Sequence, residues 1–289
     1  MLVLAKWILG GPLQALAAAV ALALVPGLGW ASAAVVALVA LRQNLAQAAL
    51  PLVGALLVAM LLHWPAGDIT QAGSVVAALV GALVLANLRS LSWTLVSLAL
   101  TAVVYMALVI FGAPGVIEQL VSVLEPQFQD LLAQMKSANP DSPGVLEQLD
   151  VRSVVLEGSA WVVTLGAVAA LLVARWLQAR LYNPGGFRQE FHSLRLMPAI
   201  AVALAVLVWL TQSFPALRYA APCLVMPLFL AGLGLVHGLM GMKPNNGPLL
   251  AFFYLGLVLT FWMGMLVLSL VAVVDSFMDF RNRIQKRYE

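Results

Sequence analysis

The chain is a succession of long apolar runs separated by short segments rich in proline, glycine and charge. A helix that spans a bilayer needs about 20 apolar residues at a rise of about 1.5 Å each, and most runs approach or exceed that length. The runs are Ile8 to Leu24, Ala31 to Leu41, Ala48 to Leu62, Val75 to Leu88, Trp93 to Phe111, Val154 to Ala174, Pro198 to Leu210, Ala221 to Met240 and Leu249 to Val274. The pattern predicts an all-α polytopic transmembrane bundle of eight or nine helices, in one integral membrane domain over residues 1–289.

One long polar stretch, residues 112–159, interrupts this pattern. Its apolar residues recur at spacings of three and four, which predicts an amphipathic helix: Ile117, Leu120, Val121, Leu124, Phe128, Leu131, Leu132 and Met135. Pro126 is expected to kink this helix or start it afresh, because proline lacks a backbone donor. A turn at 139–144 and a shorter helix with Leu146 and Leu149 should follow. Residues 112–153 are therefore interpreted as an extracytoplasmic insertion, either a strap on the outer surface or a lid over a cavity.

The composition excludes a water-soluble protein. Hydrophobic residues make up 63% of the chain and charged residues 9%, with a mean hydropathy of +1.00, whereas soluble domains carry about 25% charged residues. The net charge of +3 does not point to nucleic acid, since the basic residues lie mostly between the apolar runs and in the last nine positions. The lone Cys223 rules out an intrachain disulfide. The expected partner is the lipid bilayer.

The charges also predict orientation, with one conflict. Seven of the twelve acidic residues but only two of the fifteen basic ones lie in residues 112–159, and the positive-inside rule places such a segment outside. A cytoplasmic N-terminus then puts Arg42, Arg89, the group from Arg175 to Arg195, and Lys243 inside. Nine full crossings would, however, leave the basic tail from Arg281 outside. Either the last run is bent or re-entrant, with a break near Gly264, or the first two runs do not both cross.

No catalytic motif accompanies this layout. A phosphate-binding GxxxxGK[ST] loop, HExxH, GxSxG and CxxC are absent, and the three histidines are scattered. The prediction is a non-enzymatic protein without metal or cofactor. His63 and Asp68 sit at a membrane edge and are interpreted as solvated. Polar residues within membrane spans are functional candidates by default, with helix–helix bonding or an interfacial ion-pair network as the alternative: Gln14, Asn87, His237, Asp275 and Asp279.

Two patterns predict contacts with a protein partner. After the turn formed by residues 183–186, Phe187 and Phe191 repeat on one face of a short helix, with Arg188 and Arg195 beside them. This pattern indicates a basic amphipathic helix on the cytoplasmic surface, either a docking face or a simple connector. In the first run, Ala15, Ala19 and Ala23 recur at spacing four, a pattern that lets helices approach closely.

Together these features resemble the YybS-like family of uncharacterised bacterial membrane proteins. The resemblance rests on the paired short N-terminal runs, the outer helix after the fifth run, the segment 182–196 and the closing Val274-Asp275-Ser276-Phe277-Met278-Asp279-Phe280-Arg281. That family is distantly similar to the substrate-binding S components of energy-coupling-factor transporters. The resemblance implies a small-molecule site near the outer face and coupling to a partner through the row of Ala15, Ala19 and Ala23. The additional runs and the long outer segment depart from the six-helix S component.

Two functions follow as hypotheses. The first is a membrane protein that binds a small solute or helps to transport it, without ATPase activity of its own. It predicts a protein-lined cavity under residues 116–135. The second is a scaffold or regulatory subunit of a membrane complex, docking through residues 182–196 and the basic tail. A membrane enzyme acting on lipid is a third reading, weakened by the lack of any clustered acid–base or metal-binding set.

Overall fold

The computed structural model describes residues 1–138, 150–242 and 246–285, and this part of the chain is helical without a strand. Six helices are long and apolar enough to cross a membrane, which confirms a polytopic all-helical fold. They are α4 (Leu45–Val58) continued by the π-helical turn η1 (Ala59–His63), α5 (Thr70–Leu88), α6 (Leu91–Gly112), α9 (Val151–Tyr182), η3 (Pro215–Ala220) with α12 (Ala221–Met240), and α14 (Phe261–Met278). The shorter apolar helices are α2 (Pro12–Leu24), α3 (Gly29–Arg42), α11 (Pro198–Ser213) and α13 (Gly247–Leu259).

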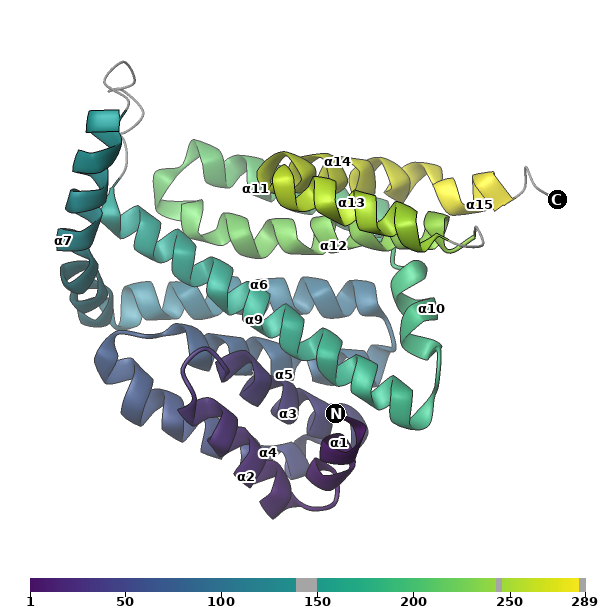
Figure 1. Ribbon diagram of the computed structural model, residues 1–289, viewed down its shortest axis with the longest axis horizontal. Helices are drawn as coiled ribbons and strands as arrows, with labels where there is room; N and C mark the ends of the chain where they lie inside the picture. Colours follow the sequence, from purple (N-terminus) through teal and green to yellow (C-terminus); the bar gives the residue numbers. More distant parts are fainter. Residues whose placement is uncertain (139–149, 243–245, 286–289) are drawn as a thin grey trace.

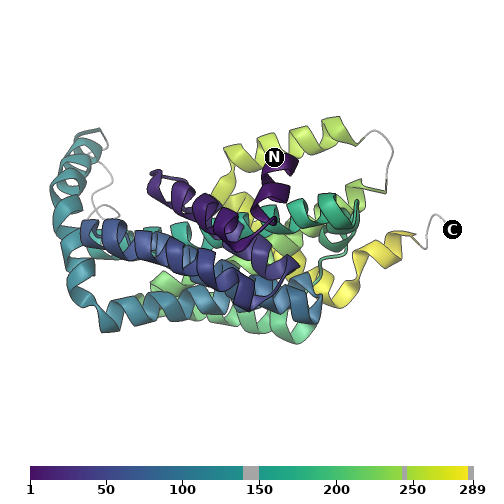
Figure 2. The same ribbon diagram turned by 90° about the horizontal axis from the view of Figure 1, so that it is seen from below.

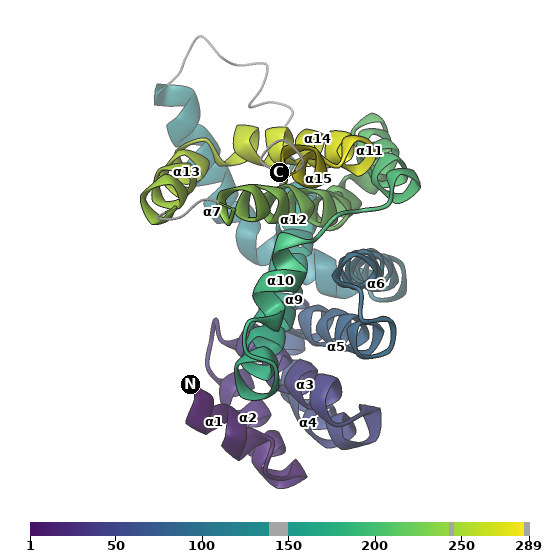
Figure 3. The same cartoon turned by 90° about the vertical axis from the view of Figure 1, so that its right-hand side faces the viewer.

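The apolar helices run side by side, and α9 passes through the middle of the molecule (Figures 1 and 3). It packs against α3, α5 and α6 on one side and α12 on the other. At one end α7 (Pro114–Ala138) lies across the bundle (Figures 1 and 2). At the other lie α10 (Gly186–His192) and the C-terminal α15 (Phe280–Gln285). We call these the α7 end and the tail end.

The two ends carry opposite charge. At the α7 end, Arg152 pairs with Glu118, and at the tail end Arg195 Nη1 lies 2.6 Å from Asp279 Oδ2. Acidic side chains predominate at the α7 end, where the described ones are Asp68, Glu118, Glu125, Asp130, Asp150 and Glu157. Arginines gather at the tail end: Arg42, Arg89, Arg175, Arg180, Arg188, Arg195, Arg281 and Arg283.

The helix of the first apolar run starts later than the run itself. The chain breaks at Gly10–Gly11, between α1 (Leu2–Ile8) and α2, so the run that begins at Ile8 is helical as α2 only from Pro12. A β-carbon on Gly11 would overlap the side-chain oxygen of Gln14, and Pro12 then opens α2 with its preset φ. The remaining helix is short: 13 residues correspond to about 20 Å.

The last apolar run is also divided, at Thr260 rather than near Gly264. Thr260 has φ −122° and ψ 37°, outside the helical region, and separates α13 from α14. The helix α13 starts at the tail end, where Asn246 bonds to Met240 O, and α14 returns there to bring Asp279 to Arg195. The basic tail therefore lies at the same end as the other arginines, which removes the conflict in the charge distribution.

Within the acidic stretch, α7 (Pro114–Ala138) continues as one helix through Pro126, so the predicted fresh start at this proline is wrong. Only Ile117 and Leu132 of α7 are buried, as expected for a helix lying along a surface. Gln119 Nε2 donates to Pro65 O at 2.9 Å and ties α7 to the loop after α4. The shorter helix expected around Leu146 and Leu149 falls outside the described residues.

Small residues set the helix spacing. Ala15, Ala19 and Ala23 are 1%, 0% and 0% exposed, and Ser32 Oγ of α3 donates to Ala19 O at 2.8 Å. The alanine row thus packs helices of this chain together and presents no free surface to a partner. A similar close approach joins α12 to α14, where a β-carbon on Gly232 would overlap the carbonyl oxygen of Leu268.

We expect Gly232→Ala to lower the free energy of unfolding by about 1–3 kcal/mol, because the added methyl group forces α14 away from α12. The matched control is Gly256→Ala on α13, where a β-carbon meets nothing within 4 Å. That variant should be neutral or slightly stabilising, since alanine favours a helix more than glycine does. Denaturant unfolding in detergent measures both; equal effects would contradict the close approach.

The sidedness is tested by thiol labelling of intact cells with a membrane-impermeant maleimide. The native Cys223 is 0% exposed and should not react. We expect Ser193→Cys and Arg283→Cys, both exposed at the tail end, to be accessible from one side and Ser137→Cys on α7 from the other. Labelling of Arg283→Cys together with Ser137→Cys would show that α13 and α14 do not form a hairpin.

Candidate functional site

A cleft of about 500 Å³ opens towards the α7 end, between the α2–α3 turn, the end of η1, the start of α5 and the middle of α9. Polar and aromatic side chains line one part of it and small or aliphatic ones the rest. The lining residues are Pro26, Gly27, Gly29, Trp30, His63, Asp68, Thr70, Gln71, Ser74, Val162, Leu165, Gly166 and Ala169. A concave site with a few convergent polar groups among apolar walls is typical of small-molecule binding.

Local sequence explains how these walls come together. Glycine at position 166 lets α9 approach α5, because a β-carbon there would lie 2.7 Å from Ser74 Oγ. Gly29 similarly makes room for the side chain of Gln71, 3.0 Å from where a β-carbon would be. Gly27 has φ 79° and closes the α2–α3 turn in a conformation that side chains disfavour. Glycine therefore occupies three of the positions that shape the cleft.

His63 and Asp68 are both fixed in orientation. The π-helical turn places His63 Nε2 3.0 Å from Ala23 O, and since a carbonyl only accepts, Nε2 is the donor. Asp68 Oδ1 accepts from the backbone N and the hydroxyl of Thr70, at 2.8 and 2.7 Å. The remaining Oδ2 faces His63 Nδ1 at 3.8 Å, too far for a direct hydrogen bond. Asp68 Oδ2 and His63 Nδ1 are therefore held in place at the cleft without a hydrogen bond to each other.

Gln71 is the exceptional residue of this cleft. It is 5% exposed, and its Nε2 has no hydrogen-bond partner; among the described residues only Arg281 Nε shares that condition. Arg281 still bonds through Nη1 to Asp275 and through Nη2 to Leu194 O. An unsatisfied buried donor costs about 1–3 kcal/mol. An acceptor atom of a bound solute would satisfy Gln71 Nε2.

The cleft offers hydrogen-bonding groups and one aromatic face. Ser74 Oγ donates to Thr70 O at 2.9 Å and Val163 O at 3.2 Å, so no base activates it as a nucleophile. No cluster of three metal-ligating side chains occurs in the part of the chain that the structure describes. Trp30 is 38% exposed and offers an apolar face beside the polar groups. The cleft can therefore hold a small solute that has both hydrogen-bonding atoms and a flat apolar surface.

The relation of α7 to this cleft differs from a lid. None of its residues is among the lining ones, so the expected cavity directly under residues 116–135 is not where the cleft lies. Instead α7 braces the loop that leads to Asp68, since Leu120 packs beside Gly67 and Gln119 bonds to Pro65 O. The helix supports the rim of the cleft from outside.

Residues chosen from sequence lie elsewhere. Gln14 is half-buried at the α1–α2 turn, and Asn87 is exposed with its Nδ2 bonded to Leu83 O of its own helix at 2.7 Å. His237 Nε2 lies 2.6 Å from the Tyr254 hydroxyl, between α12 and α13 near the tail end. None of the three reaches the cleft.

Asp275 and Asp279 form the ion-pair network that was the alternative to a functional role. Asp275 is 2% exposed and accepts from Arg281 Nη1 at 2.8 Å and Phe280 N at 2.9 Å. Asp279 pairs with Arg195, whose Nη2 also donates to Ser276 O at 2.9 Å. This network fastens α14 and α15 to the segment after α10.

The proposed docking face on α10 is partly occupied within the chain. Arg195 forms an ion pair with Asp279, whereas Arg188 is exposed. The rings of Phe187 and Phe191 lie 6.0 Å apart and line a groove of about 430 Å³ between α9, α10, α12 and α13. Arg188 and this aromatic pair are the members of the predicted face that remain accessible.

The sequence alone did not identify the residues that line the cleft, for a physical reason. From the sequence, His63 and Asp68 are interpreted as solvated because they flank the turn at residues 64–67. The sequence feature that could have indicated the cleft is the pair Gln71 and Ser74. These two polar residues lie three positions apart, on one face of the mostly apolar helix α5.

Comparisons with family models, curated proteins and solved structures found no match to this chain. The likeness to the YybS-like family therefore stays a prediction, and the geometry of the cleft carries the functional argument.

The tail end offers a test by pH. Burial, and then the nearby Arg188, His237 and Arg281, lower the pKa of His192 on α10. The unfolded chain then takes up a proton more readily than the folded one, so stability is intact above about pH 6.5 and falls as the pH drops below it. We expect unfolding curves in detergent between pH 8 and 5 to show a smaller acid loss for His192→Gln than for the wild type. Parallel pH profiles would contradict this origin.

Proposed function

We propose that this chain binds a small polar solute in the α7-end cleft and helps to transport it, as a non-enzymatic protein of the bacterial cytoplasmic (inner) membrane. The observation that carries the proposal is the buried Gln71 amide without a partner, beside His63, Asp68 and Trp30. A polar group inside the membrane is costly and is a functional candidate by default. The chain has no nucleotide-binding motif, so any ATPase that drives transport belongs to a partner, as in S components.

The orientation follows from the charges. The arginine-rich tail end faces the cytoplasm under the positive-inside rule, with both termini there, and α7 lies outside as an extracytoplasmic strap. Eight crossings, α2 to α6, α9, α11 and α12, satisfy this arrangement, because an even number returns the chain to its starting side. The α13–α14 pair then enters from the cytoplasmic side as a hairpin, with Trp262 packed beside Trp161 of α9 at 5.7 Å.

The test uses the purified full-length protein and a thermal-shift screen of small polar metabolites. We expect a hit to stabilise the wild type and not Gln71→Met, which removes the amide at nearly equal volume. Without ligand, Gln71→Met should be as stable as the wild type or about 1 kcal/mol more stable, because an unsatisfied buried donor is gone. Gln212→Met is the matched control: it is exposed at the same end, is not a cleft residue and should respond like the wild type.

A scaffold or regulatory subunit is the second candidate, favoured by the exposed Arg188 and the aromatic groove formed by Phe187 and Phe191. A protein partner recovered in stoichiometric amount from detergent, with no metabolite shifting the wild type, would support this role over solute binding. Equal ligand responses of Gln71→Met and the wild type would remove the cleft from consideration.

A further inference from the structure

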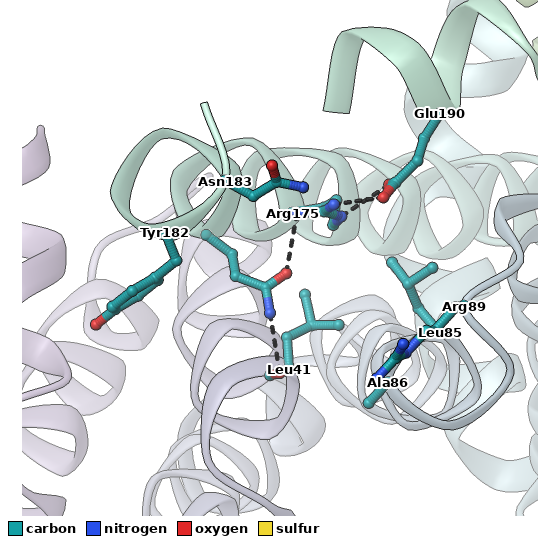
Figure 4. Close-up of a pocket in the computed structure, with 9 residues that line it drawn as sticks. Leu41, Leu85, Ala86, Arg89, Arg175, Tyr182, Asn183 and Glu190 are labelled. Carbon is teal, nitrogen blue, oxygen red and sulfur yellow. Dashed lines mark hydrogen bonds and ion pairs between the residues drawn. The ribbon is translucent and has the colours of Figure 1, made fainter. Parts of the chain in front are cut away.

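A second cavity, of about 400 Å³, lies at the tail end, opposite the cleft (Figure 4). It is bounded by the ends of α3, α5, α9 and by α10. Its lining is mostly polar, and the residues are Leu41, Leu85, Ala86, Arg89, Arg175, Gln178, Tyr182, Asn183 and Glu190. The α7-end cleft shares none of these residues, so the two cavities can be tested separately.

The walls of this tail-end pocket are held by a chain of hydrogen bonds. Arg175 is 8% exposed and donates two hydrogen bonds to the carboxylate of Glu190 (Figure 4). One of them joins Nε to Oε2 at 2.8 Å. Its Nη1 donates to Gln178 Oε1 at 3.2 Å, and Gln178 Nε2 donates to Leu41 O at 3.0 Å. These bonds join α10, α9 and α3, so the pocket is formed before any ligand arrives.

The pocket carries an excess of positive charge. Two guanidinium groups line it, those of Arg89 and Arg175, against one carboxylate, that of Glu190. A third guanidinium, of Arg42, stacks 4.0 Å above the ring of Tyr182, which is itself a lining residue. Arg175 is neutralised by its pair with Glu190, whereas no carboxylate among the described residues lies within ion-pair distance of Arg89. Arg89 is therefore the charge available to a ligand.

The backbone at Arg89 supports the same conclusion. Arg89 ends α5 with φ 51° and ψ 32°, a left-handed conformation in which glycine is the usual residue and a β-carbon is disfavoured. The side chain is exposed and makes no ion pair within the described part of the chain, so the fold gains nothing visible from an arginine here. The guanidinium of Arg89 is therefore free to contact a ligand in the pocket.

We propose that the tail-end pocket binds a phosphate group, carried by an anionic phospholipid headgroup or by a small phosphorylated solute. The planar guanidinium of Arg89 presents paired donors that match phosphate oxygens, and the Asn183 amide supplies a further hydrogen-bonding group. Basic pockets between membrane helices on the cytoplasmic side are characteristic sites for anionic lipid headgroups. The Arg175–Glu190 ion pair forms one wall of the pocket, and the guanidinium of Arg89 binds the anion.

Two probes separate the sources of the phosphate. Inorganic phosphate is titrated into the full-length protein in neutral detergent at ionic strength matched with sodium chloride, with binding followed by calorimetry. In parallel, the protein is placed in nanodiscs of phosphatidylcholine alone or with phosphatidylglycerol, and retained phosphatidylglycerol is counted by native mass spectrometry. Binding of inorganic phosphate indicates a soluble ligand, and retention of phosphatidylglycerol alone indicates a lipid headgroup; either result supports the site.

Variants assign the binding to Arg89. We expect Arg89→Gln to weaken the response to the active probe about tenfold or more, because one charge-assisted contact is lost. Arg218→Gln is the matched control, an exposed arginine at the opposite end, and should bind like the wild type. Arg89→Gly should unfold at the same or a higher temperature yet lose binding, since glycine suits the backbone there. An equal loss in Arg218→Gln, or no response to either probe, would overturn the proposal.

Discussion

The structure depends on one constraint: a polar group inside a membrane must find its partner within the protein. Helices satisfy the backbone, and the polar side chains bond either to carbonyl groups of their own helix or to those of a neighbouring helix. Ser32 donates to Ala19 O, Ser74 to Val163 O and Tyr105 to Ile69 O. Each bond requires the helices to approach closely, which the many alanine and glycine residues permit. Among the described residues Gln71 Nε2 and Arg281 Nε break this rule, and Gln71 lines the α7-end cleft.

The same three helices, α3, α5 and α9, line both the α7-end cleft and the tail-end pocket. Gln71 and Arg89 stand near opposite ends of α5, and Val162 and Gln178 are similarly separated along α9. A movement of α9 against α3 and α5 would change both cavities at once. A hydrogen bond from Gln178 of α9 to Leu41 O of α3 holds these two helices together at the tail end. The two cavities therefore share the packing of these three helices.

Periodicity and charge were sufficient for the general architecture. Apolar runs of membrane length predicted the helices, and the spacing around Ile117 and Leu132 predicted the amphipathic α7. The breaks were harder, because both lie inside apolar sequence. Gly10–Gly11 interrupts the first run and Thr260 the last, and neither changes the hydrophobic pattern. A helix also continued through Pro126, where the local preference favoured an interruption.

The sequence by itself determined the class of the protein, the acidic character of one end and the basic character of the other, because hydrophobicity and charge are sums over residues. Only the tertiary structure decided which polar residues meet. Asp275 and Asp279, for which the sequence allowed either a functional role or an ion-pair network, pair with Arg281 and Arg195. Gln71 stands out only in the folded chain, where Gly29 makes room for its side chain and α5 packs against α9. Whether a buried polar group is paired depends on neighbours that are distant in sequence, and that information exists only once the helices are packed.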